Sequence, residues 1–153
     1  MAPEKNAKSR GFLDSPLAVP ILGLLIGIVS FIAVCGTAVL DFGYTDWMMV
    51  EQAGDMTQHI VGWQYFQADP WAFPLGLSKS QAYPFGLTIT YMDVIPLMAI
   101  VTKLFRGVLP DSSQFFGFWM LICYALQGLF AALIVRRWTD NKALIAMSAA
   151  FFT

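Results

Sequence analysis

The sequence predicts an all-α, polytopic membrane protein with three to four spans and interfacial helices in its first extracytoplasmic loop. Composition is the first reason, because 58% of the 153 residues are hydrophobic and 12% are charged, with a mean hydropathy of +0.62. The second reason is the length of two uncharged runs, residues 16–40 and residues 115–135. A helix of about 20 apolar residues is long enough to cross a bilayer.

Residues 1–15 form a short polar N-terminus that carries Lys5, Lys8 and Arg10. Positive charges beside the first span favour the cytoplasmic side, so we expect a cytoplasmic N-terminus and a transmembrane helix over residues 16–40. A cleaved signal peptide is the alternative interpretation. The apolar run is longer than the about 7–15 residues of a signal-peptide core, which favours the uncleaved helix.

Residues 41–91 are expected to form an extracytoplasmic loop with an interfacial helix. Asp55 and Gln58 are spaced as a capping box and predict a helix over residues 56–67. Residues 71–86 contain prolines, glycines and aromatic residues, which predicts irregular chain. Their rings suit the headgroup region of a bilayer.

Residues 92–109 are predicted to be a transmembrane or a re-entrant helix. The 23 residues from 87 to 109 are enough to cross a bilayer. Lys103 and Arg106 would then extend to the cytoplasmic face along their aliphatic stems. We favour the full span over the re-entrant alternative.

Residues 115–135 are predicted to be the next transmembrane helix, followed by Arg136 and Arg137. If residues 87–109 span the membrane fully, the arginines lie on the extracytoplasmic side, which breaks the positive-inside rule. If that segment is re-entrant, the arginines lie in the cytoplasm and the rule is obeyed. Residues 143–153 are interpreted as the start of a truncated transmembrane helix, because they reach only about half of a bilayer. We therefore expect the chain to be the N-terminal part of a longer polytopic protein.

Asp55 and His59 are four residues apart and would share one face of the predicted helix. Such a pair could act as a general base, or Asp55 could help to hold a divalent metal ion. The simpler alternative is that Asp55 only caps the helix and His59 is an interfacial side chain.

Two further carboxylates are candidates for chemistry. Asp93 opens an apolar run, and a charge at membrane depth suggests a function; its alternative role is an N-cap favoured by the helix dipole. Asp46 could be a catalytic or metal partner, although a solvated loop charge is the commoner explanation.

Some classes of function are disfavoured by charge and cysteine content. The net charge is -1 and the chain lacks a basic cluster, which argues against a nucleic-acid partner. Cys35 and Cys123 lie inside apolar runs, where a thiol behaves as a small hydrophobic side chain. They predict neither a disulfide framework nor a metal site.

Over half of the chain resembles large bacterial inner-membrane proteins of the GT-C glycosyltransferase type. The resemblance rests on four motifs in the order that this family uses: GDMTQHIVGWQYF, DPWAFPLG, YPFGLTITYMDVIPLMAIVTKLF and VLPDSSQFFGFWMLICYALQGLF. It implies a multi-pass inner-membrane enzyme that moves a sugar from a polyprenyl-phosphate donor to an acceptor outside the cytoplasm. The lipid bilayer and the polyprenyl-phosphate-linked sugar would be its partners, together with the rest of a longer chain or partner membrane subunits.

The resemblance also implies roles for individual residues. Asp55 matches the acidic residue of the first extracytoplasmic loop, His59 the polar residue one turn later, and Asp93 the carboxylate before the next helix. The family's tandem acidic motif is missing, because Met56 follows Asp55, and metal dependence stays open. The candidates for substrate binding are Trp63, Arg136 and Arg137. Arg offers a bidentate fork for a lipid phosphate.

Two other functions remain open at this point. The chain could be a small, non-enzymatic membrane subunit whose interfacial loop docks a larger complex. It could also be part of a transporter, which would require the carboxylates to line a path between helices.

Overall fold

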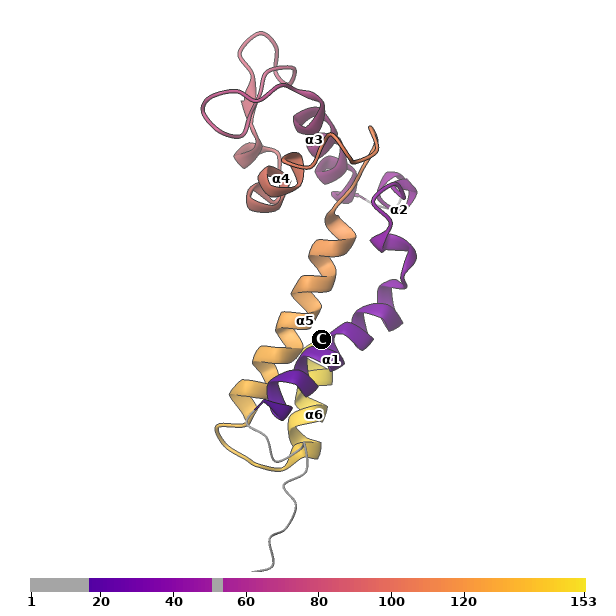
Figure 1. The fold of residues 1–153 in the computed structure, drawn as a ribbon, viewed down its shortest axis with the longest axis vertical. Helices are drawn as coiled ribbons and strands as arrows, with labels where there is room; N and C mark the ends of the chain where they lie inside the picture. The colour runs from indigo at the N-terminus through magenta and orange to yellow at the C-terminus, as the bar shows by residue number, and fades with distance from the viewer. Residues whose placement is uncertain (1–16, 51–53) are drawn as a thin grey trace, which may run out of the picture. The chain divides into compact units, whose positions relative to one another are not determined.

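The computed structural model describes residues 17–50 and 54–153, so the predicted cytoplasmic segment 1–15 lies outside the described residues. The fold is mostly helical (Figure 1). The chain divides into two compact units. The first combines the chain up to Cys35 with residues 121–153, and the second consists of residues 36–120.

The first unit pairs helix α1 (Ala18–Cys35) with the greater part of helix α5 (Phe116–Val135). The two backbones approach closely at glycines. A Cβ atom added at Gly27 would lie 2.1 Å from the Tyr124 carbonyl oxygen, and one added at Gly128 would lie 2.3 Å from the Gly23 oxygen. Small residues at such crossings let membrane helices pack by van der Waals contact.

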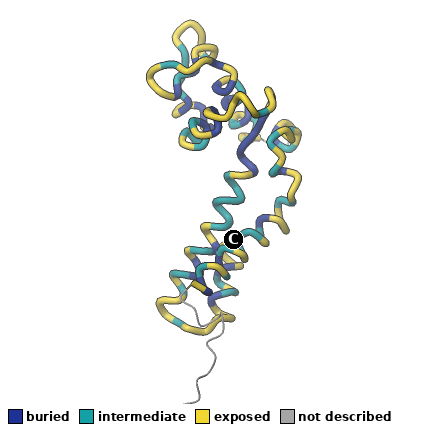
Figure 2. The backbone as a smooth tube through the Cα atoms, viewed as in Figure 1, coloured by how far each residue is buried: buried dark blue, intermediate teal, exposed yellow. Residues whose placement is uncertain are grey.

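The outer faces of both helices are apolar and exposed. On α1 the side chains of Leu25, Val29 and Val34 are more than half exposed, and on α5 so are those of Phe130 and Ile134. Figure 2 shows this exposure along both helices. The core helix of a soluble protein would bury such residues, whereas lipid accepts them. Two described helices, α1 and α5, are therefore long and apolar enough to cross a membrane.

Helix α1 is shorter than the predicted segment 16–40. It ends at Cys35, and Gly36 follows with φ +72°, a left-handed conformation that commonly stops a helix. A short 3₁₀ turn, η2 (Ala38–Leu40), covers the rest of the predicted segment.

Helix α6 (Lys142–Phe151) completes the first unit and begins where the sequence predicts a new apolar helix. The Asn141 side chain caps it by accepting hydrogen bonds from the backbone N–H groups of Ala143 and Leu144. Ile145 and Ala149 are buried and pack in a cluster that includes Val19 of α1.

The second unit is built around helix α3 (Met56–Ala68), which confirms a helix at the predicted residues 56–67. Its core contains Ile60, Trp63 and Phe66 of α3 together with Phe115. The smaller elements around it are α2 (Asp46–Met49), β1 (Leu77–Ser78), β2 (Leu87–Thr88), η4 (Ile89–Tyr91) and α4 (Pro96–Lys103). Strands β1 and β2 form one antiparallel pair, a small addition to the predicted all-α fold.

The full span predicted over 87–109 is not found. Helix α4 has eight residues and is therefore about 12 Å long, less than half of the about 30 Å of a hydrocarbon core. The chain from 92 to 114 instead follows α3 along its length. Met92 and Val94 lie against Gly62, Pro110 accepts a hydrogen bond from Gln67, and Ser113 donates one to the same side chain.

Candidate functional site

His59 and Asp93, separated by 34 residues in the sequence, meet at the exposed face of the second unit. His59 lies in the first half of α3, and its Nδ1 atom makes a short hydrogen bond with the backbone carbonyl oxygen of Asp93. The Oδ2 atom of Asp93 is 3.7 Å from the same nitrogen. Two of the three side chains predicted to be catalytic are thus brought together by the fold.

The hydrogen bond to Asp93 determines which ring nitrogen of His59 is available. A carbonyl oxygen can only accept, so Nδ1 carries the proton in this bond. In the neutral ring Nε2 is then the unprotonated nitrogen, able to take a proton from another molecule. The His59 ring also lies against Phe116, with centroids 5.9 Å apart. Its side chain is 21% exposed, which leaves the ring accessible.

The backbone around Asp93 is held in an uncommon conformation. Asp93 has φ +57° and Ile95 has φ +54°, with the fully buried Val94 between them. Positive φ is unusual for Asp and more so for a β-branched residue, and such strain often marks functional sites. A Cβ atom added at Gly62 would lie 2.7 Å from Val94 Cγ1, so this glycine allows α3 to hold the Asp93 segment against His59.

Asp55 occupies the N-cap position of α3, but its side chain makes no capping hydrogen bond. The prediction that the Asp55 carboxylate caps the helix is therefore wrong in its side-chain detail, because the residue itself has helical φ and ψ. The residue is exposed and lies one turn before His59. Its carboxylate is available for other interactions on that face.

Trp63, predicted to bind substrate, is instead a core residue. Its side chain is fully buried, and its Nε1 donates a hydrogen bond to the Ser113 carbonyl oxygen at 2.8 Å. The ring also makes an edge contact with Phe115, with centroids 5.0 Å apart. A ring that is enclosed and has its polar atom satisfied cannot also contact a substrate.

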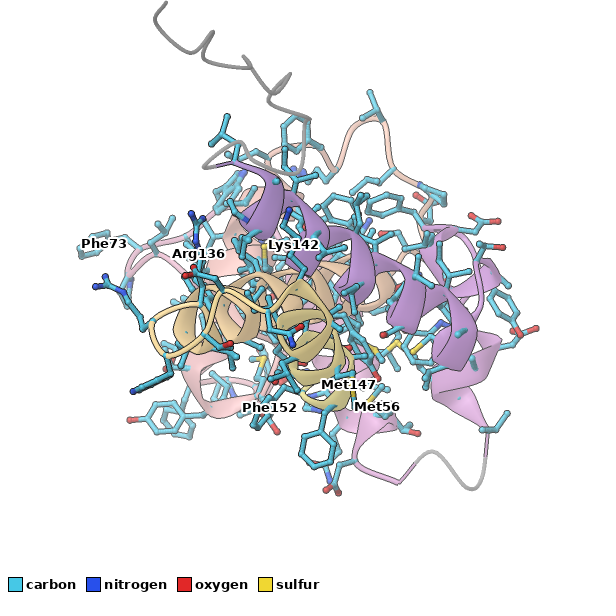
Figure 3. The ribbon with its side chains drawn as sticks, turned by 90° about the horizontal axis from the view of Figure 1, so that it is seen from below. Met56, Phe73, Arg136, Lys142, Met147 and Phe152 are labelled. Atoms are coloured by element: carbon cyan, nitrogen blue, oxygen red, sulfur yellow. The ribbon has the colours of Figure 1, made fainter. Side chains whose placement is uncertain are left out.

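Arg136 and Arg137 follow the last residue of α5 and belong to the first unit; Figure 3 labels Arg136. His59 and Asp93 belong to the second unit. Asp46 begins α2 in the second unit. Arg136 and Arg137 therefore belong to a different unit from the His59 and Asp93 pair, whereas Asp46 belongs to the same unit as the pair.

Lys103 is a buried charge that the sequence reasoning misinterpreted. We expected Lys103 and Arg106 to extend to the cytoplasmic face, but Lys103 is fully buried and its Nζ lies 3.8 Å from the Phe66 ring centroid and 4.8 Å from that of Trp71. Among the described residues this ammonium makes no hydrogen bond. Burial, with a smaller contribution from Arg106, lowers the Lys103 pKa from 10.5 to about 8.

Asp69 anchors the loop around Lys103. Its Oδ2 accepts hydrogen bonds from the Ser78 hydroxyl at 2.6 Å and from the Ser80 backbone at 3.1 Å, and its backbone oxygen accepts one from Arg106. Burial raises the Asp69 pKa, but the hydrogen bonds that its carboxylate accepts, chiefly from Ser78 and Ser80, outweigh burial and hold the pKa below its usual value. The spacing of Asp69 and Lys103 in the sequence carries no periodic signal that would have revealed this arrangement.

A divalent metal ion at Asp55 finds few additional ligands. Among residues 17–50 and 54–153, no group of three or more His, Cys, Asp and Glu side chains gathers as a metal site. Asp55 and the Nε2 atom of His59 would supply two ligands, fewer than the three or more protein ligands usual for a dedicated site. Metal binding therefore stays a prediction, and no chemical step is assigned to a metal.

Residues 24–153 match the model of a protein family described as a domain of unknown function, DUF6311. No curated protein and no solved structure matches the chain.

Proposed function

The chain belongs to the DUF6311 family, and we propose that it is a membrane-embedded part of a GT-C-type glycosyltransferase whose site contains His59 and Asp93. The observation that carries this proposal is the contact between these two residues, in a segment between two helices that are long and apolar enough to span a membrane. The four motifs that resemble GT-C proteins include both residues. A polyprenyl-phosphate-linked sugar is the proposed donor.

The proposed topology has α1 leaving the cytoplasm and α5 returning to it. Lys5, Lys8 and Arg10 before α1 and the arginine pair after α5 then lie on the cytoplasmic side, which obeys the positive-inside rule. The second unit, with His59 and Asp93, is extracytoplasmic. In this topology Arg136 and Arg137 are topological anchors and do not bind the substrate. In this topology α3 and α4 lie at the membrane interface.

The proposed chemistry is a proton transfer coupled to displacement at a sugar carbon. The acceptor hydroxyl oxygen attacks the anomeric carbon while its proton moves to Nε2 of His59. The bond from that carbon to the phosphate oxygen breaks, and its electron pair leaves with polyprenyl phosphate. The Asp93 carboxylate, 3.7 Å from Nδ1, stabilises the imidazolium that forms. Asp55 contributes a second negative charge on the same face of α3.

A non-enzymatic docking subunit is the second candidate, because one loop of the second unit exposes several rings. Phe73, Tyr83 and Phe85 are 93%, 85% and 90% exposed, and Figure 3 shows Phe73 pointing outward from its own loop. Large exposed apolar side chains that cluster often mark an interaction surface. A docking role requires these rings but neither His59 nor Asp93.

Substitution of Asp93 tests the enzymatic proposal in the complete protein. Asn tolerates positive φ about as well as Asp, so Asp93→Asn keeps the backbone and removes only the charge. We expect transfer from a polyprenyl-phosphate sugar to fall by roughly 10²–10⁴-fold, the usual contribution of acid–base groups. Asp140→Asn, an exposed change in the loop after α5, is the matched control. Normal transfer by Asp93→Asn would exclude this carboxylate from the chemistry.

Asp55→Asn tests the third residue that was predicted to be catalytic, after His59 and Asp93. The Asp55 side chain makes no capping bond, so its substitution should leave thermal stability in detergent near that of the wild type. Loss of transfer would assign the Asp55 carboxylate to the reaction. Retained transfer would restrict the site to His59 and Asp93.

A further inference from the structure

An open pocket of about 270 Å³ lies beside the His59 and Asp93 pair. Gln58 and Gly62 of α3 form one side of it, and Gln81, Tyr91 and Asp93 form the other. Asp93 belongs both to the pocket and to the contact with His59. A molecule in this pocket would therefore lie next to the proposed acid–base pair.

The groups around the pocket suit hydroxyl groups. The Gln58 and Gln81 amides each offer two donor hydrogens and an acceptor oxygen, and the Tyr91 hydroxyl both donates and accepts. Val61, Leu87 and Met92 add apolar surface between these polar groups. A ring with polar edges and an apolar C–H face matches both kinds of surface.

The charge of the pocket restricts its ligand further. Asp93 is the one charged side chain among the residues that line it, and none of the lining residues is Lys or Arg. An anionic ligand in the pocket would lie beside the Asp93 carboxylate without a compensating cation. Two negative charges this close together repel each other. The pocket thus disfavours a sugar that carries an anionic group on the ring held inside it, such as a carboxylated sugar.

We propose that this pocket binds a single uncharged, hydroxyl-rich ring, the size of one monosaccharide, and discriminates against anionic sugars through Asp93. Its volume is just below the about 300–1,000 Å³ of pockets for larger ligands, which agrees with one ring. The proposal rests on the proposed function, because it specifies the sugar class handled at the same site. It adds that Gln58 and Gln81 determine specificity.

A binding experiment with two matched probes tests this proposal. Methyl glucoside and methyl glucuronide differ in one group, a CH₂OH in the first and a carboxylate in the second. Saturation-transfer NMR on the full chain in nanodiscs should show binding of the glucoside and at least roughly fivefold weaker binding of the glucuronide. Equal binding of the two probes, or no binding of the glucoside, would overturn the proposal.

Variants connect the binding to the residues named. Gln81→Ala should weaken glucoside binding roughly fivefold, the effect of about one lost hydrogen bond. Gln64→Ala is the matched control, because the Gln64 amide lies outside this pocket and bonds to Ser112. Asp93→Asn should remove the preference for the glucoside. An effect of Gln81→Ala equal to that of the control, or a preference that survives Asp93→Asn, would contradict the assignment.

Binding and transfer fail in distinguishable ways. If the glucoside binds as expected but the complete protein transfers no sugar, the pocket assignment stands and the enzymatic function is rejected. If transfer occurs but neither probe binds, the enzymatic function stands and this pocket is not the sugar site.

Discussion

Lys103 provides the sharpest test of the second unit, because it is a charge that the fold buries without a hydrogen-bond partner among the described residues. Its ammonium lies over the rings of Phe66 and Trp71, an attraction worth about 0.5–2 kcal/mol. Burial opposes this attraction and, together with Arg106, lowers the Lys103 pKa from 10.5 to about 8. The two effects compete, and their balance can be measured by removing the charge.

We expect Lys103→Met to stabilise the protein at pH 7. Each pKa unit corresponds to about 1.4 kcal/mol, so a value of about 8 disfavours the charged folded form by up to about 3 kcal/mol. Loss of the attraction to the two rings offsets part of this gain. Met keeps the length of the side chain and makes favourable contacts with aromatic rings. The expected net gain in the free energy of unfolding is roughly 1–3 kcal/mol.

The gain should depend on pH in a defined direction. Below about pH 8, Lys103 is protonated in both the folded and the unfolded state. Between about 8 and 10.5 the folded state loses its proton first, so the unfolded state binds more protons and the wild-type protein gains stability as pH rises. The advantage of Lys103→Met should therefore shrink over this range.

Unfolding by SDS titration of the wild type, Lys103→Met and Lys79→Met between pH 7 and 10.5 measures this difference. Lys79 is exposed, and its substitution controls for the loss of one positive charge. Subtracting the wild-type free energy of unfolding from that of each variant at every pH removes the contribution of the other titrating groups. A destabilised Lys103→Met at pH 7, or an advantage that is constant with pH, would refute the reasoning.

Two further predictions concern the membrane helices and their orientation. Gly27→Ala places a Cβ atom 2.1 Å from the Tyr124 oxygen, so α1 and α5 must separate, and we expect the free energy of unfolding in SDS to fall by about 1–3 kcal/mol. The control Gly107→Ala, with open space around it, should change this free energy by less than about 0.5 kcal/mol. A stabilised Gly27→Ala would contradict the close packing. The second prediction uses single cysteines in a protein whose two native cysteines are replaced by alanine. In intact cells, a cysteine replacing Lys79 should react with a membrane-impermeant thiol reagent, and a cysteine replacing Trp138 should not. Labelling at position 138 but not at position 79 would reverse the proposed topology.

Local signals in the sequence predicted the helices of this protein well. The apolar runs predicted α1 and α5. The capping-box spacing of Asp55 and Gln58 predicted α3 to within one residue at each end. These predictions succeed because length and composition decide whether a helix can cross a bilayer. The end of α1 was less predictable, since Gly36 lies inside an apolar run.

The segment from 92 to 114 shows why length and composition can mislead. It is long enough to cross a bilayer, but both of its ends contact the same helix, α3. Lys103 and Arg106, which looked like membrane-surface cations, bind the rings and the Asp69 carbonyl of the same unit. Tertiary contacts between distant segments leave no periodic pattern in the sequence, so this part of the fold needed the structure.

The pairing of His59 with Asp93 was likewise only half predictable. Both residues were candidates, His59 because it lies four residues after Asp55 on the predicted helix and Asp93 because it opens an apolar run. Their contact depends on the left-handed conformation of Asp93 and on the missing side chain of Gly62. Neither feature follows from residue type or spacing. The structure thus added the geometry on which the proposed role of His59 as a base rests.

That geometry assigns different tasks to the two nitrogens of His59, and they can be separated by substitution. Nδ1 binds the Asp93 carbonyl and holds the segment in place, whereas Nε2 is left for proton transfer. An asparagine amide nitrogen lies about where Nδ1 does and can donate the same hydrogen bond. His59→Asn should therefore keep thermal stability near that of the wild type while transfer falls by roughly 10²–10⁴-fold. His59→Ala, which removes both nitrogens, should also lose stability, by about 0.5–1.5 kcal/mol. Transfer at the wild-type rate by His59→Asn would show that Nε2 is not the base, and the role would then pass to the carboxylate of Asp55 or Asp93.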